Sequence, residues 1–166
     1  MKRTDKSASD DPFEISFLPK RIVSGGQTGV DRAGLDVAIA LGLDHGGWCP
    51  AGRLAEDGSV PSRYELRETE SSDYPARTKQ NVIDSDATLI LFEQELKGGT
   101  RLTKRFCREL EKTHRVAEIN PESISGVKQW FIEQQPEILN IAGPRESTYP
   151  GIYDRAFEYL LKAFTK

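Results

Sequence analysis

The sequence predicts an α/β protein in which a parallel sheet of about five strands is covered by helices on both faces. Short apolar runs alternate along the chain with segments of helical periodicity, the pattern of repeated strand–helix units. The clearest run, residues 87–92, is apolar at almost every position, as expected of a strand buried on both faces. Together these observations predict a three-layer α/β/α arrangement.

Each expected element follows from its own local pattern. Buried or half-buried strands are expected at residues 21–24, 45–49, 87–92, 115–119 and 137–142. Helices are expected at residues 30–41, 75–84, 102–113, 124–134 and 152–164, with Gly42 and Pro121 at helix boundaries. Residues 50–61 are expected to form a loop. The polar residues 1–16 lack periodicity, so we expect a mobile tail followed by a single domain at residues 17–166.

The composition limits the classes of partner. The chain has 166 residues and a net charge of −3, without a basic block, which argues against a nucleic-acid polymer. No apolar run approaches the roughly 20 residues that cross a bilayer. The basic residues near the start are followed by polar residues, so neither a membrane span nor a signal peptide is expected, and we expect a cytoplasmic location. In that compartment Cys49 and Cys107 are expected to be free thiols.

Three of the expected strands end in segments with the same chemistry. These segments are Ser24, Gly25, Gly26, Gln27, Thr28 and Gly29 with Asp31 and Arg32; Gly98, Gly99, Thr100 and Thr103; and Gly143, Pro144 and Arg145. Carboxyl ends of parallel strands meet at one edge of a sheet, so we expect the three segments to lie together. Glycines let backbone N–H groups approach an anion, helix N-termini add donors, and arginine adds a charged fork. A small phosphorylated ligand is therefore predicted, although each segment alone also fits a tight strand-to-helix turn.

Further candidates lie between the first and third strands. Glu56 and Asp57 are adjacent carboxylates that suit acid–base chemistry or a hydrated Mg²⁺, and equally suit a solvated surface pair. Arg53, Arg63 and Tyr64 share their loop. Arg77 and Asn81 lie four residues apart on one helix face, where they reach the ligand or form a surface pair.

Several common sites are missing from the sequence. His45 and His114 are isolated, and no cysteine pair has zinc spacing, so no metal site is predicted. Cys49 suits either a buried structural role or a soft metal such as molybdenum. The first glycine segment has neither the dinucleotide-binding pattern nor a phosphate-loop lysine, which argues against a standard nucleoside triphosphatase.

The segment from Ile22 to Ala33 resembles the opening motif of the molybdenum carrier (molybdenum cofactor carrier-like) family. That family is also described as circularly permuted relatives of the YpsA-like, SLOG-type nucleotide-binding proteins. Further matching pieces follow in order: Gly46-Gly47-Trp48-Cys49-Pro50, Gly52-Arg53, Glu56-Asp57-Gly58, Arg77-Thr78, Asn81-Val82, Ser85-Asp86, Gly98-Gly99-Thr100, and Ala142 to Ser147. The resemblance covers residues 20 to 164. It implies a Rossmann-like fold and a dimer or tetramer.

The permutation carries an implication for topology. The last strand, residues 137–142, resembles the first strand of the unpermuted fold, so it should insert between the first and third strands. Numbered along the chain, the implied strand order is 2-1-5-3-4. This order would bring the three glycine segments side by side.

The resemblance implies a binding or carrier protein whose cargo is molybdenum cofactor or a nucleotide-like molecule. N–H groups of Gly25 to Gly29 and of Gly99-Thr100 would hold phosphate. Positive charge would come from Arg32, Arg53, Arg77 and Arg145, and Trp48 or Tyr64 would stack on the ring. Related lysine-decarboxylase-like (LOG) phosphoribohydrolases keep a catalytic glutamate at the position of Thr103, which argues against that activity. The alternatives are an enzyme that processes a nucleotide or nucleoside phosphate with Glu56 or Asp57, and a nucleotide sensor module.

Overall fold

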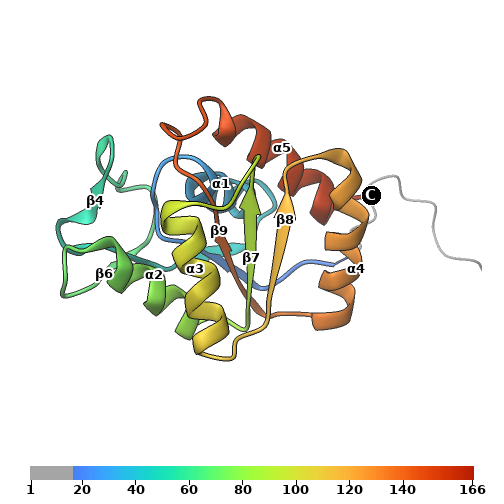
Figure 1. The fold of residues 1–166 in the computed structure, drawn as a ribbon, viewed down its shortest axis with the longest axis horizontal. Helices are drawn as coiled ribbons and strands as arrows, with labels where there is room; N and C mark the ends of the chain where they lie inside the picture. Colours follow the sequence, from blue (N-terminus) through green and yellow to red (C-terminus); the bar gives the residue numbers. More distant parts are fainter. Residues whose placement is uncertain (1–16) are drawn as a thin grey trace, which may run out of the picture.

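The protein is described here by a computed structural model of residues 17–166, and the tail expected at residues 1–16 lies outside this range. Five parallel strands form the central sheet: β1 (Arg21–Val23), β2 (Asp44–Gly46), β7 (Ala87–Phe92), β8 (His114–Glu118) and β9 (Ile138–Ala142). Their order is β2-β1-β9-β7-β8, and every neighbouring pair is parallel (Figure 1). The predicted fold class and the implied strand order are both confirmed, because the last strand does lie between the first and third strands of the prediction.

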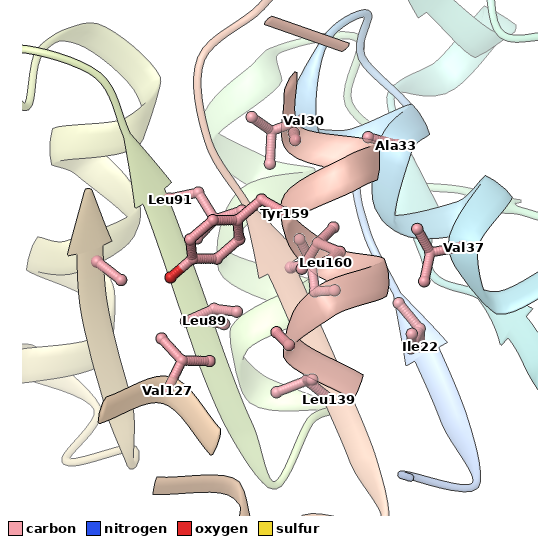
Figure 2. Packing of buried hydrophobic residues seen from close by; sticks show 14 of the residues in the cluster. Ile22, Val30, Ala33, Val37, Leu89, Leu91, Val127, Leu139, Tyr159 and Leu160 are labelled. Atoms are coloured by element: carbon pink, nitrogen blue, oxygen red, sulfur yellow. The ribbon is translucent and has the colours of Figure 1, made fainter. Parts of the chain in front are cut away.

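Helices cover both faces of this sheet. The helices α1 (Val30–Ala40), α4 (Ile124–Gln134) and α5 (Ile152–Phe164) pack on one face, and α2 (Tyr74–Ile83) and α3 (Gly98–Glu109) on the other. Figure 2 shows Leu89 and Leu91 of β7 beside Tyr159 of α5 in the larger core cluster. Ile90, between those two leucines, packs instead with Cys107 of α3. This period of two is the alternation of a strand covered on both faces.

A smaller unit follows β2. It contains β3 (Trp48–Cys49), β4 (Leu54–Ala55), β5 (Gly58–Ser59) and β6 (Arg67–Glu68), in which β3 pairs with β6 and β4 with β5. The strand predicted at residues 45–49 is therefore wrong in extent, because it divides between two sheets at Gly47. Gly47 has a backbone φ of 122°, a conformation that residues other than glycine rarely adopt. The loop predicted at residues 50–61 contains the β4–β5 hairpin, and β6 was not predicted.

The remaining elements lie within a few residues of their predicted bounds, with one exception. The helix predicted at residues 102–113 is α3, which begins at Gly98 and ends at Glu109. The prediction placed the two glycines outside the helix because glycine is a poor helix former. At its other end, Glu111 takes a φ of 53° and ends the helical path. The segment Gly98-Gly99-Thr100 is thus the first turn of a helix rather than a loop before it.

The two cysteines, Cys49 and Cys107, are free thiols, as predicted, and both are buried. Among the described residues, no helix has both the length and the apolar character needed to cross a bilayer.

Candidate functional site

A cavity of about 460 Å³ opens where the carboxyl end of β9 meets the first turn of α3. Of the residues singled out from the sequence, it is lined by Gly25, Gln27, Asp31, Arg77, Asn81, Gly98, Gly99, Thr100, Thr103, Gly143, Pro144 and Arg145. The structure therefore brings parts of all three glycine segments to one cavity. Thr78, Lys97, Asn140, Ile141, Ala142 and Thr148 complete the lining.

The first glycine segment is packed tightly and uses most of its own N–H groups. Gly26 N–H donates to Ser24 Oγ at 3.4 Å, Gln27 N–H to Asp31 Oδ2 at 3.2 Å, Thr28 N–H to Gln27 Oε1 at 3.1 Å and Val30 N–H to Pro144 O at 3.1 Å. Gly29 has a φ of 81°, and a Cβ there would overlap the Pro144 carbonyl oxygen. Ser24, Gly26, Thr28 and Gly29 do not line the cavity. This segment therefore contributes side chains to the cavity more than a row of backbone donors.

Gln27 lines the cavity, and its side-chain amide has a free donor. Its Oε1 accepts from the N–H groups of Thr28 at 3.1 Å and Glu56 at 2.9 Å, which fixes the orientation of the amide. Its Nε2 is buried and has no hydrogen-bond partner among the described residues, although Gln27 is only 5% exposed. Buried polar groups are almost always hydrogen-bonded, and leaving one unpaired costs about 1–3 kcal/mol. An acceptor oxygen of a ligand in the cavity would satisfy this donor.

The first turn of α3 adds backbone donors on the same cavity. The first N–H groups of a helix lack acceptors within the helix, and they carry the positive end of its dipole. At α3 these groups belong to Gly98, Gly99 and Thr100, and Lys97 at the N-cap position provides no side-chain cap. The hydroxyl of Thr103 donates to the Gly99 carbonyl at 2.9 Å. A helix N-terminus of this kind favours a bound anion.

Basic side chains outnumber acidic ones around the cavity. Its charged lining consists of Arg77, Lys97 and Arg145 against Asp31. Arg77 is buried, donates to the Gly25 carbonyl at 2.5 Å and lies 3.8 Å from Asp31 Oδ2. Burial raises the pKa of Asp31, while the charge of Arg77 opposes this rise. The excess of positive charge favours an anionic ligand.

The candidate acids Glu56 and Asp57 lie outside the cavity lining and have partners. Glu56 accepts from Thr28 Oγ1 and from both the N–H and hydroxyl of Ser147, at 3.1 and 2.5 Å for the latter two. Burial alone would raise the pKa of Glu56, but the hydrogen bonds from Ser147 and Thr28 outweigh it and lower the pKa. Asp57 forms two bonds with Arg32, at 2.6 and 2.8 Å, and these lower its pKa. Glu56 therefore connects loops of the protein, and Asp57 connects its own loop to α1.

Three other candidate residues have structural contacts. Arg53 lies outside the cavity lining, and its guanidinium donates to the backbone carbonyls of Val60, Pro61, Tyr64 and Leu66. Asn81 lines the cavity, but its amide also pairs with both backbone groups of Trp48, at 2.8 and 2.9 Å. Arg77 and Asn81 are both buried, so the surface pair considered for them does not form. Cys49 is buried outside the cavity lining, and burial raises its thiol pKa.

The aromatic side chain next to the cavity differs from the two considered from the sequence. Tyr64 is 1% exposed and donates its hydroxyl to Asp36, and Trp48 donates Nε1 to Asp84 at 2.7 Å. Tyr74 instead carries two cavity-lining guanidiniums over its ring, at 5.2 Å for Arg77 and 5.5 Å for Arg145. No periodic pattern in the sequence indicates that Tyr74 lies at the site.

Among the remaining lining residues, Asn140 and Lys97 were also missed. Asn140 is a buried polar residue inside an otherwise apolar strand, and this interruption was a usable signal. Lys97 directly precedes the second glycine segment. Within residues 17–166 no group of three or more His, Cys, Asp or Glu side chains is placed to hold a metal ion.

Comparisons with known proteins agree with this architecture. The family model described as the circularly permutated YpsA SLOG family matches residues 22–164. A crystal structure from Syntrophus aciditrophicus SB, described as "Putative molybdenum carrier protein", is 43% identical, with a TM-score of 0.82 over 89% of this chain and 95% of that chain. No curated protein matches the chain. The chain belongs to the circularly permutated YpsA SLOG family.

Proposed function

We propose that this protein is a binding or carrier protein for a small phosphorylated ligand, which it holds in the cavity between β9 and α3. One observation carries the proposal: Gln27, whose buried Nε2 has no partner among the described residues, and the first turn of α3 line the same cavity. Both features are hydrogen-bond donors, and the surrounding side chains are mainly basic. The cavity volume of about 460 Å³ also lies within the range common for small-molecule sites.

In this proposal the phosphate lies at the N-terminus of α3. The N–H groups of Gly98, Gly99 and Thr100 donate to its oxygens together with Gln27 Nε2. Arg145 supplies charge from the opposite loop, where its Nε also lies 3.9 Å from Glu56 Oε2. The guanidinium of Arg145 also offers a planar surface on which a ring of the ligand stacks.

Molybdenum cofactor is the first cargo we propose, because it is a phosphorylated pterin and the 43% identical relative is described as a molybdenum carrier. A nucleotide has the same combination of phosphate and planar ring, and is the second. No contact among the described residues favours the enzymatic role considered for Glu56 and Asp57, because both lie outside the cavity lining and their oxygens are occupied by protein donors.

Isothermal titration calorimetry with inorganic phosphate, AMP and molybdopterin tests the proposal. Arg145→Gln should weaken binding about tenfold or more, since a charged hydrogen bond contributes about 1.5–3 kcal/mol. Arg67→Gln is the matched control, because Arg67 lies outside the cavity lining. The proposal is wrong if none of the three ligands binds at millimolar concentration, or if both variants change the affinity equally.

A further inference from the structure

A groove of about 920 Å³ runs along the outer face of α3. Gly98 lines both this groove and the cavity, so the two spaces adjoin at the first turn of the helix. Leu96 and Leu102 give the groove an apolar part, and basic side chains of α3 provide most of its charge. The N-terminus of α3 therefore borders both the cavity and the groove.

Three basic side chains of the groove have no partner. Arg101, Lys104 and Arg108 make no side-chain hydrogen bond or ion pair with any other described residue, whereas Arg105 pairs with Glu109 at 3.1 Å. Positions i, i+3 and i+7 lie on one face of a helix, so the three charges are neighbours. In a chain of net charge −3, this is a local concentration of unneutralised positive charge.

The helix geometry sets the spacing between the two regions. At about 1.5 Å per residue, Arg101 lies about 4.5 Å along the axis from Gly98, and Lys104 about 9 Å. Side chains on a helix lean toward its N-terminus, which brings both cations nearer to the cavity. Together they suit a second anionic group about 5–10 Å from a phosphate at the first turn.

We propose that the groove is a second anion subsite, and that the ligand of this protein carries two phosphate-like groups. This inference rests on the proposed function, because the first group occupies the cavity. The second group lies against Arg101 and Lys104, and the connecting part of the ligand passes Gly98. The chemical class is thus a small organic bisphosphate, or a ligand with an equivalent second anion.

Linear alkanediol bisphosphates test this spacing without assuming the ring of the ligand. Calorimetry would compare bisphosphates of increasing chain length with alkyl monophosphates of the same lengths. We expect one intermediate length to bind at least about tenfold more tightly than its monophosphate, the factor given by one charged hydrogen bond. Arg101→Ala/Lys104→Ala should remove this gain and leave monophosphate affinity unchanged. The control Lys79→Ala/Lys162→Ala removes the same charge from exposed positions outside the groove, and should keep the gain.

The possible failures are distinguishable. If monophosphates bind but no bisphosphate gains affinity, the second subsite is wrong and the proposed function stands. If the affinity for a bisphosphate depends on Arg101 and Lys104 but not on Arg145, the assignment of the first phosphate to the cavity is wrong instead. If nothing binds, both fail. A 20-nucleotide oligothymidylate provides a further test. If it binds more tightly than every bisphosphate, and Arg145→Gln does not change its affinity, the groove is a nucleic-acid surface and the inference is wrong.

Discussion

Gln27 shows how one side chain serves both the loop and the cavity. Its oxygen is held by the N–H groups of Thr28 and Glu56, and its nitrogen is buried and unpaired in a residue that lines the cavity. Gln27→Glu keeps the acceptor but replaces the donor by a negatively charged oxygen. We expect phosphate affinity, measured by calorimetry, to fall about tenfold or more. Gln129→Glu on α4 makes the same change at an exposed position and should leave the affinity unchanged.

Asp36 is a buried carboxylate with a structural role. It accepts from Arg63 at 2.9 Å, from the hydroxyl of Tyr64 at 2.9 Å and from the hydroxyl of Tyr153. Burial and the bond to Asp36 raise the pKa of Tyr153 to about 12. These contacts join α1 to α5 and to the loop at residues 63–64.

Asp36→Asn places an NH₂ group opposite donors and removes the charge that Arg63 faces. We expect the free energy of unfolding in urea to fall by about 2–4 kcal/mol. Asp44→Asn, at an exposed position, should change it by less than about 0.5 kcal/mol. Equal effects of the two variants would show that the Asp36 contacts contribute nothing specific.

At the scale of elements, the glycine segments are of two kinds: the first is a tightly packed loop, whereas Gly98-Gly99-Thr100 is the first turn of a helix. Their composition indicated strand-to-helix turns near a ligand, and their position at one edge of the sheet followed from parallel topology. The sequence could not show that the Thr28 hydroxyl of the first segment donates to Glu56, because the two residues are 28 positions apart. Nor did it show that Gly98 and Gly99 begin a helix, because glycine propensity argues against one.

Glu56 joins the first segment to the segment after β9, and its effect should depend on pH. Its pKa is below the ordinary value of 4.5, so its stabilisation is present above that value and is lost as the pH falls through the folded-state pKa. Glu56→Gln should lower the free energy of unfolding by about 1–2 kcal/mol at neutral pH. Urea titrations should show this difference shrinking as the pH falls below the ordinary pKa of 4.5 and through the folded-state pKa. A constant difference across pH would contradict the argument, and exposed Glu65→Gln is the control.

At the scale of the whole molecule, the strand order of the central sheet could be predicted from the sequence, whereas the short paired strands could not. The resemblance to a permuted family implied that β9 lies beside β1, and Arg21 does pair with Ile138, 117 positions away. By contrast, β3, β4, β5 and β6 have two residues each, too few for a period of two to be recognised. Tyr74, at the start of α2, comes next to the site only through three-dimensional packing, which places the guanidiniums of Arg77 and Arg145 over its ring.

The same architecture predicts an order of local stability. Amides of β7 and β9 lie in the centre of the sheet under both helical layers, so they should exchange with solvent only through global unfolding. The β4–β5 hairpin has only two residues per strand, and it should open at much lower free energy. Native-state hydrogen exchange measures both. Equal protection of the hairpin and the central strands would contradict this order.

The central claim is that the cavity holds a phosphate at the N-terminus of α3, with the Gln27 amide as a further donor. Crystals soaked in tungstate, an anion of the size and charge of phosphate with a strong anomalous signal, test it most directly. The expected result is an anomalous peak whose oxygens lie about 2.7–3.2 Å from the N–H groups of Gly98 to Thr100 and from Gln27 Nε2. A peak at the Gly26–Gly29 backbone, or peaks only outside the cavity, would contradict the claim.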